Sequence, residues 1–158
     1  MIFSTLPYRF RPLLSGILFA TIGMTLSACA FMPPHVAMSS IELSVTDKAN
    51  DGKPLNVDFV AVRSEKLVQK IEALTASQWF EQKQQILKEN PGNLIVWPVK
   101  MLPGSQITVK DVPISGKPAD SLILFAGYKS KGAHRLVLND IRHPKLELRD
   151  DDVYLFDD

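Results

Sequence analysis

The sequence predicts a mainly β domain, built as an antiparallel sandwich or barrel with a short helical insertion. After residue 40, apolar and polar residues alternate in several short segments, and turn-forming residues separate these segments. One interval, between the second and third of them, instead places its apolar residues at helical spacing. Many short strands with turns between them are typical of all-β sandwiches and barrels.

The first two strands are predicted at residues 41–45 and 55–62, where apolar residues alternate along the chain. In the second strand, alternate residues from Leu55 to Ala61 form one strongly apolar face. Between the strands, residues 47–54 are polar and contain Asp51-Gly52, a pair that favours a tight reversal. The pattern therefore predicts two strands joined by a polar turn.

The insertion is predicted to contain two helices. Apolar residues from Leu67 to Leu74 follow the 3.6-residue spacing, with charged and amide side chains on the other face. Thr75, with Gln78 three residues later, has the spacing of a capping box and predicts the start of a second helix. That helix is expected to end at Asn90-Pro91-Gly92.

Aromatic residues near the insertion have two interpretations. Trp79 and Phe80 lie on the second predicted helix, where they are expected to pack it onto the sheet. The alternative is a ligand platform formed by these residues or by Trp97, which would require exposed rings.

The remaining strands follow the insertion. One is predicted at residues 94–99, where Pro98 places it at a sheet edge or a bulge. After the Pro103-Gly104 turn, a strand at 106–109 is expected to extend toward Ile114. The other predicted strands are a buried one at 122–128, its hairpin partner at 134–138, and a last pair on either side of Asp150-Asp151-Asp152.

The N-terminus has the pattern of a cleaved lipoprotein signal peptide. Arg9 and Arg11 precede a short apolar core at residues 12–26, which is too short to span a bilayer comfortably. The core is followed by Leu26-Ser27-Ala28-Cys29, an apolar residue and two small ones before a cysteine, as in a lipobox. The alternatives are an uncleaved membrane anchor and a cysteine placed there by chance.

This pattern predicts a signal peptide at residues 1–28, a lipidated tether at 29–40 and a periplasmic β-sandwich domain at 41–158. Cys29 is the lipid attachment residue, and several acyl chains on one residue anchor a protein stably. In enteric-type bacteria an Asp after the cysteine retains lipoproteins at the inner membrane, so Ala30 favours the outer membrane.

Composition argues against several functional classes. Removing Arg9 and Arg11 from the 18 basic residues leaves 16 against 17 acidic residues, a net charge of about −1. No basic excess therefore indicates nucleic acid or anionic lipid as a partner. Cys29 is the only cysteine, so the mature chain has no disulfide of its own and depends on an apolar core.

No sequence motif indicates catalysis, a metal site or a cofactor. His35, His134 and His143 lack a second ligand at metal-binding spacing, which favours surface or structural roles. The Asp150-Asp151-Asp152 run lacks the glycine and the later glutamate of a calcium loop, so an acidic hairpin tip is expected. No Gly-x-Ser-x-Gly elbow is present. We expect neither an enzyme nor a small-molecule substrate.

The mature chain resembles the TssJ/SciN family of outer-membrane lipoproteins of the type VI secretion system. The residues that carry the resemblance occur in the family's order, and they are the lipobox at Cys29, Asn50-Asp51-Gly52-Lys53-Pro54, Trp79-Phe80, Leu102-Pro103-Gly104 and Ala126-Gly127-Tyr128 followed by Arg135. One departure is His134, which stands where the family often has a tryptophan before that arginine.

The resemblance implies a transthyretin-like β-sandwich that docks an inner-membrane partner of the TssM type. In this family the loop between the first two strands contacts that partner. Here the resemblance assigns partner binding to Asp47, Lys48, Asn50, Asp51, Gly52 and Lys53. It implies no cofactor beyond the covalent lipid on Cys29.

Three alternatives remain open from the residues. The polar loop at 47–54 equally fits a plain solvated turn. A pilotin-like lipoprotein would hold a secretin tail in a groove or on a sheet edge such as the strand containing Pro98. A periplasmic ligand-binding lipoprotein would need a pocket lined by aromatic residues with converging polar groups.

Overall fold

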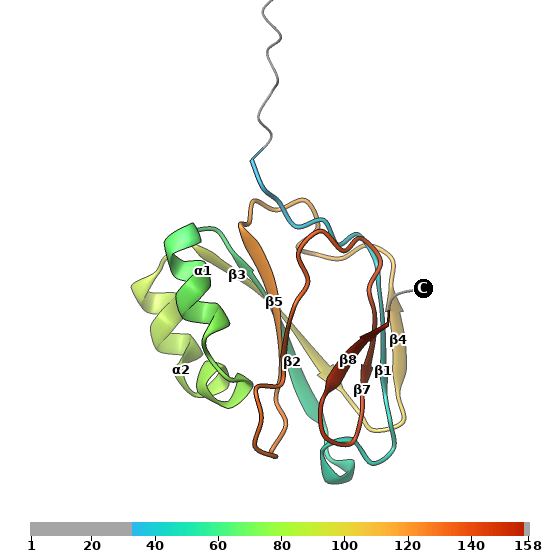
Figure 1. The fold of residues 1–158 in the computed structure, drawn as a ribbon. Helices are drawn as coiled ribbons and strands as arrows, with labels where there is room; N and C mark the ends of the chain where they lie inside the picture. Colours follow the sequence, from blue (N-terminus) through green and yellow to red (C-terminus); the bar gives the residue numbers. More distant parts are fainter. Residues whose placement is uncertain (1–32, 157–158) are drawn as a thin grey trace, which may run out of the picture. The chain divides into compact units, whose positions relative to one another are not determined.

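The computed structural model describes residues 33–156, which form two four-stranded β-sheets and two α-helices (Figure 1). The predicted signal peptide and Cys29 lie outside the described residues. The elements, in order, are β1 (Ile41–Val45), the 3-10 helix η1 (Ala49–Gly52), β2 (Leu55–Val62), α1 (Glu65–Glu72), α2 (Ala76–Glu89), β3 (Leu94–Met101), β4 (Gln106–Val109), β5 (Ser121–Ala126), β6 (Arg135–Val137), β7 (Lys145–Leu148) and β8 (Val153–Phe156). Among the described helices, none has the length and apolar character needed to cross a membrane.

The strands are ordered β4-β1-β7-β8 in one sheet and β3-β2-β5-β6 in the other. Every neighbouring pair is antiparallel except β1 and β7, which run parallel. The segments that lead into these two strands already lie side by side, because the Ser39 N–H donates to the Arg142 carbonyl at 2.9 Å. Both strands therefore start at the same end of the sandwich. The expected purely antiparallel pairing is wrong at this one pair.

The main core lies between the two sheets. Leu55, Val57 and Phe59 of β2 are fully buried there, together with Leu43 of β1 and Leu148 of β7. The alternation along each strand directs these residues to the shared interior. Burying apolar side chains between two such faces is the dominant stabilising term for a domain that has no disulfide.

The second face of β2 is also buried, because the helical insertion covers it. Val60 and Val62 pack with Ile123 of β5 and Ile71 of α1 in a separate apolar cluster. Figure 1 shows both helices on one face of the β3-β2-β5-β6 sheet. The sequence predicted one apolar face for this strand, and the insertion accounts for the second.

The start of α2 confirms the predicted capping box. The Gln78 N–H donates to Thr75 Oγ1 at 3.2 Å, and the Thr75 N–H donates to Gln78 Oε1 at 2.9 Å. One turn further on, Trp79 is fully buried and stacks on Phe125 with ring centroids 5.2 Å apart. Its interpretation as a packing residue is confirmed, while Phe80 is only half-buried.

The strand β4 is shorter than predicted. β4 ends at Val109, and Ile114 is a buried residue of the turn in which the Ser115 N–H donates to the Val112 carbonyl at 2.9 Å. Pro113 removes a backbone donor, which prevents the strand from continuing. β3, which contains Pro98, is an edge strand as predicted.

The packed domain begins before residue 41. Val36 and Met38 are buried in the main core, Val36 N–H donates to the Lys117 carbonyl, and Ala119 N–H donates to the Pro34 carbonyl. The tether predicted to run to residue 40 is therefore shorter, and residues 34–40 belong to the domain. Pro33-Pro34 correctly indicated a segment outside the strands, but Val36 and Met38 supply apolar side chains that the core accepts.

We expect Met38→Ala to lower the free energy of unfolding by about 2–5 kcal/mol, because it leaves a cavity at a fully buried position. Urea denaturation followed by tryptophan fluorescence measures this loss. Leu102→Ala is the matched control, since Leu102 is 55% exposed and its loss should cost no more than about 0.5 kcal/mol. Equal stabilities of the two variants would show that residues 34–40 do not pack as described.

Candidate partner-binding end

Four connections meet at one end of the sandwich, opposite the end where residue 33 enters (Figure 1). They are the β1–β2 loop at 46–54, the β3–β4 turn at 102–105, the β5–β6 connection at 127–134 and the β7–β8 hairpin at 149–152. We call this the distal end. It contains all six residues for which the resemblance implied partner contacts.

Asn50 is an interior residue that organises the loop. It is 5% exposed, and its Oδ1 accepts a hydrogen bond from the Lys129 N–H at 2.9 Å, while its Nδ2 donates to the Pro54 carbonyl at 3.3 Å. The structure therefore ties Asn50 to a second connection of the distal end. Its side chain is held inside the protein, unlike the other five predicted contact residues.

The other five residues lie on the surface. Asp47, Lys48, Asp51, Gly52 and Lys53 are all exposed. The chain reaches this geometry through three successive left-handed residues, with φ of 51° at residue 50, 56° at residue 51 and 69° at residue 52. Asparagine, aspartate and glycine tolerate that conformation better than other residues, so the predicted reversal has a clear local cause.

We expect Asn50→Ala to cost about 2–3 kcal/mol of stability, because it leaves the Lys129 N–H without its acceptor and strains the left-handed backbone. Thermal unfolding followed by circular dichroism measures the loss. Asp51→Ala is the control, since it carries the same backbone strain with an exposed side chain. If both variants lose the same stability, the buried hydrogen bonds contribute nothing.

The Leu-Pro-Gly turn packs directly against this loop. Gly104 has a φ of +70°, and a Cβ at this position would collide with the carboxylate of Asp47. Two residues earlier, Leu102 is 55% exposed, the largest exposed fraction among the large apolar residues described. We call Asp47, Lys48, Asp51, Gly52, Lys53 and Leu102 the distal surface. Sequence reasoning missed Leu102, although an apolar residue at a turn was a usable signal.

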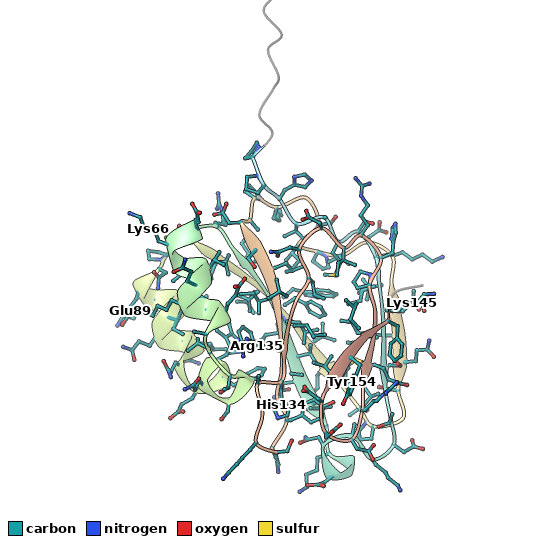
Figure 2. The ribbon with its side chains drawn as sticks, viewed as in Figure 1. Lys66, Glu89, His134, Arg135, Lys145 and Tyr154 are labelled. Carbon is teal, nitrogen blue, oxygen red and sulfur yellow. The ribbon has the colours of Figure 1, made fainter. Side chains whose placement is uncertain are left out.

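His134 connects two hairpins of the distal end (Figure 2). It is 4% exposed, its Nδ1 lies 3.1 Å from Asp152 Oδ1, and its Nε2 lies 3.0 Å from the Ser130 carbonyl oxygen. The ring also packs on Tyr128, with centroids 4.8 Å apart. The expected structural role of this histidine is confirmed.

The same contacts bring Ser130, His134 and Asp152 together, as in a serine nucleophile site. Ser130 Oγ lies 3.3 Å from His134 Nε2. However, the nearer partner of Nε2 is the Ser130 carbonyl oxygen, and Nδ1 faces the Asp152 carboxylate, so both ring nitrogens lie against acceptor oxygens. These contacts give the ring a structural role, because they join the two hairpins.

Tyr128 fixes the β7–β8 hairpin to the rest of the domain. Its hydroxyl donates a hydrogen bond shared between the Arg149 and Asp152 carbonyls, at 2.8 and 2.9 Å. Burial raises the pKa of this phenol well above its usual value, and the nearby Asp152 carboxylate adds to the effect. The hydroxyl therefore stays protonated and keeps donating throughout the physiological pH range.

The acidic tip at residues 150–152 bonds to protein donors. Asp150 Oδ1 accepts from Thr46 Oγ1 at 3.0 Å, and Asp152 Oδ1 accepts from the Val153 N–H at 2.9 Å. β7 and β8 pair around this tip as the predicted hairpin. Within residues 33–156, no group of three or more histidine, cysteine or acidic side chains is arranged to hold a metal ion.

No protein-family model matches the chain, and no curated protein sequence does. The structure does resemble solved structures. The T6SS lipoprotein TssJ1 from Pseudomonas aeruginosa matches with a TM-score of 0.57 and 14% identity, over 79% of this chain and 96% of that chain. The fold is that of a TssJ lipoprotein.

Two further solved structures match the fold of this chain. A chain of a structure described as "Type VI membrane complex" matches with a TM-score of 0.60 and 13% identity, over 80% of this chain and 100% of that chain. A chain of one described as "T6SS protein TssM C-terminal domain (869-1107) from EAEC" matches with a TM-score of 0.56 and 13% identity, over 75% and 97% of the two chains. The TssJ-like two-sheet sandwich expected from the resemblance is confirmed.

Proposed function

We propose that the protein is a lipid-anchored periplasmic component of a type VI secretion membrane complex, where it docks an inner-membrane partner of the TssM type. The observation that carries the proposal is the combination of a TssJ-like fold with a lipobox at Cys29. The fold supplies a rigid body, and the lipid supplies attachment to a membrane. This role requires an interaction surface and no reactive groups.

The positions of the two ends support this arrangement. Five residues, from Cys29 to Pro33, precede the first packed residue, and a fully extended chain of that length reaches about 17 Å. The domain is therefore held close to the membrane by the end at which residue 33 enters. The distal surface lies at the opposite end and is free to meet a partner that crosses the periplasm (Figure 1).

The distal surface has suitable chemistry for specific docking. It combines charges of both signs, on the β1–β2 loop that the buried hydrogen bonds of Asn50 hold in place, with one exposed leucine of the β3–β4 turn. A preordered loop loses little conformational entropy on binding. Anchoring in a thin layer also raises the effective concentration of the domain for its partner. Ala30 favours the outer membrane as the site of anchoring.

The test is a binding measurement between the purified protein and the periplasmic region of the TssM-type protein of the same organism. Reversing the charges of Asp47, Lys48 and Asp51 is expected to weaken binding by at least about tenfold. Reversing the charge of Lys66 is the control, because this residue lies on α1 toward the other end of the domain (Figure 2). This control variant should bind the partner with unchanged affinity. Equal affinities of the two variants would exclude this loop as the contact.

A ligand-binding lipoprotein is the second candidate, favoured by a cavity of about 320 Å³ lined by Phe80 together with Asp58, Lys83 and Lys100. Its volume is at the lower limit of known ligand pockets. A periplasmic small molecule that co-purifies with the protein and is displaced by Lys100→Glu would favour this candidate over docking.

A further inference from the structure

The cavity adjoins the distal surface. It lies between α2 and the edge strand β3, and its lining residues are Asn56, Asp58, Phe80, Lys83, Pro98, Val99 and Lys100. Asn56 follows the β1–β2 loop by two residues, and Lys100 precedes Leu102 by two. Asn56 and Lys100 are directly opposite each other in the β2–β3 register, so both side chains are on the same face of the sheet. A polypeptide that covers the distal surface therefore has a short route into this cavity.

The floor of the cavity is a buried ion pair. The side chain of Asp58 is 2% exposed, and its Oδ2 accepts hydrogen bonds from Trp79 Nε1 and from Lys83 Nζ, both at 2.9 Å. The Lys83 side chain is 30% exposed and its ammonium lies 5.3 Å from the centre of the Phe80 ring. An ammonium has three N–H donors, and Asp58 takes one of them.

The charges of the lining favour an anion. Asp58 and Lys83 neutralise each other, while Lys100 is exposed and adds a positive charge, so the lining carries a net charge of +1. Asn56 adds an amide that can donate to an oxygen atom. A cation would instead meet two ammonium groups. The volume suits a side chain better than a drug-sized molecule.

We propose that this cavity receives an acidic side chain, aspartate or glutamate, of the polypeptide docked at the distal end. The carboxylate binds between the two ammonium groups of Lys83 and Lys100, with its aliphatic stem against Phe80 and Pro98. This site rests on the proposed docking function for the identity of its partner. The preference for a carboxylate rests on the residues that line the cavity alone. Carboxylate binding and partner docking are therefore tested separately.

The direct probe is the tripeptide acetyl-Gly-Glu-Gly-amide, titrated into the ¹⁵N-labelled protein. The Trp79 indole N–H is the reporter, because it donates to the carboxylate on the cavity floor. We expect a saturable shift of this signal with weak affinity, as for any small ligand. The shift should disappear with acetyl-Gly-Gln-Gly-amide and in the Lys100→Glu variant. No shift with the glutamate peptide, or a larger shift with an arginine peptide, would overturn the proposal.

The partner measurement completes the test. Lys100→Glu should weaken binding of the TssM-type periplasmic region by about tenfold, with Lys66→Glu unchanged. If charge reversal of the loop abolishes partner binding while Lys100→Glu leaves it intact, the cavity does not receive the partner and docking stands. If the glutamate peptide shifts Trp79 but no TssM-type region binds, the docking function is wrong and the carboxylate site stands.

Discussion

Replacing Lys83 by methionine is expected to lower the free energy of unfolding by about 3–5 kcal/mol. The substitution keeps the aliphatic stem of the side chain but leaves the buried Asp58 carboxylate without its ammonium partner. Breaking a buried ion pair from one side is costly because the remaining charge is neither solvated nor paired. Urea denaturation of the purified protein measures the effect, with Lys88→Met, at an exposed position of the same helix, as the control.

The two partners of this ion pair should differ in cost. Asp58→Asn keeps an oxygen for the Trp79 indole and leaves Lys83, which is 30% exposed and can turn toward water. We therefore expect it to cost only about 1–2 kcal/mol. A loss for Asp58→Asn as large as that for Lys83→Met would show that the carboxylate itself, rather than its uncompensated charge, dominates.

Replacing Cys29 by serine is expected to move nearly all of the protein from the membrane fraction to the soluble periplasmic fraction. Serine cannot form the thioether to diacylglycerol, and no other cysteine is present in the chain. Metabolic labelling with radioactive palmitate should disappear at the same time. Cell fractionation and autoradiography measure both effects.

The control for this variant is the stability of the domain. The packed contacts described here begin at Pro34, so the urea midpoint of Cys29→Ser should equal that of the wild-type protein. A variant that stays in the membrane fraction and retains the label would show that the chain is held by another segment.

Local patterns allowed much of the fold to be predicted. The alternation in β1 and β2, the capping box at Thr75 and the proline in β3 each depend on residues close in sequence, and each is found as predicted. The parallel pairing of β1 with β7 was not predictable in this way. It depends on contacts between residues about one hundred positions apart, which no local pattern encodes.

At the distal end, too, the local turn was predictable from sequence and the long-range contacts were not. The turn at Asp51-Gly52 follows from residues that tolerate left-handed backbone. The burial of Asn50 does not follow from local sequence. Its Oδ1 accepts a hydrogen bond from the backbone N–H of Lys129, which is 79 residues further along the chain. Of the six contact residues that the resemblance implied, five are exposed and Asn50 is buried.

The buried ion pair could have been found from sequence. Asp58 occupies the same face of its strand as Val60 and Val62, so it is a single charge among apolar positions. Trp79 and Lys83 are four residues apart on α2 and so share one face of the helix. When the helix packs on the strand, Asp58 and Lys83 are brought together. A buried carboxylate paired with a lysine is therefore expected at this position.

Site-specific photo-crosslinking in intact cells tests the docking role most directly. A photoreactive residue placed at Asp51, on the distal surface, is expected to form a covalent product with an inner-membrane protein of the TssM type. The same residue at Lys66 should not form this product. A product with a secretin at residue 51, or no product with any inner-membrane protein, would contradict the docking function.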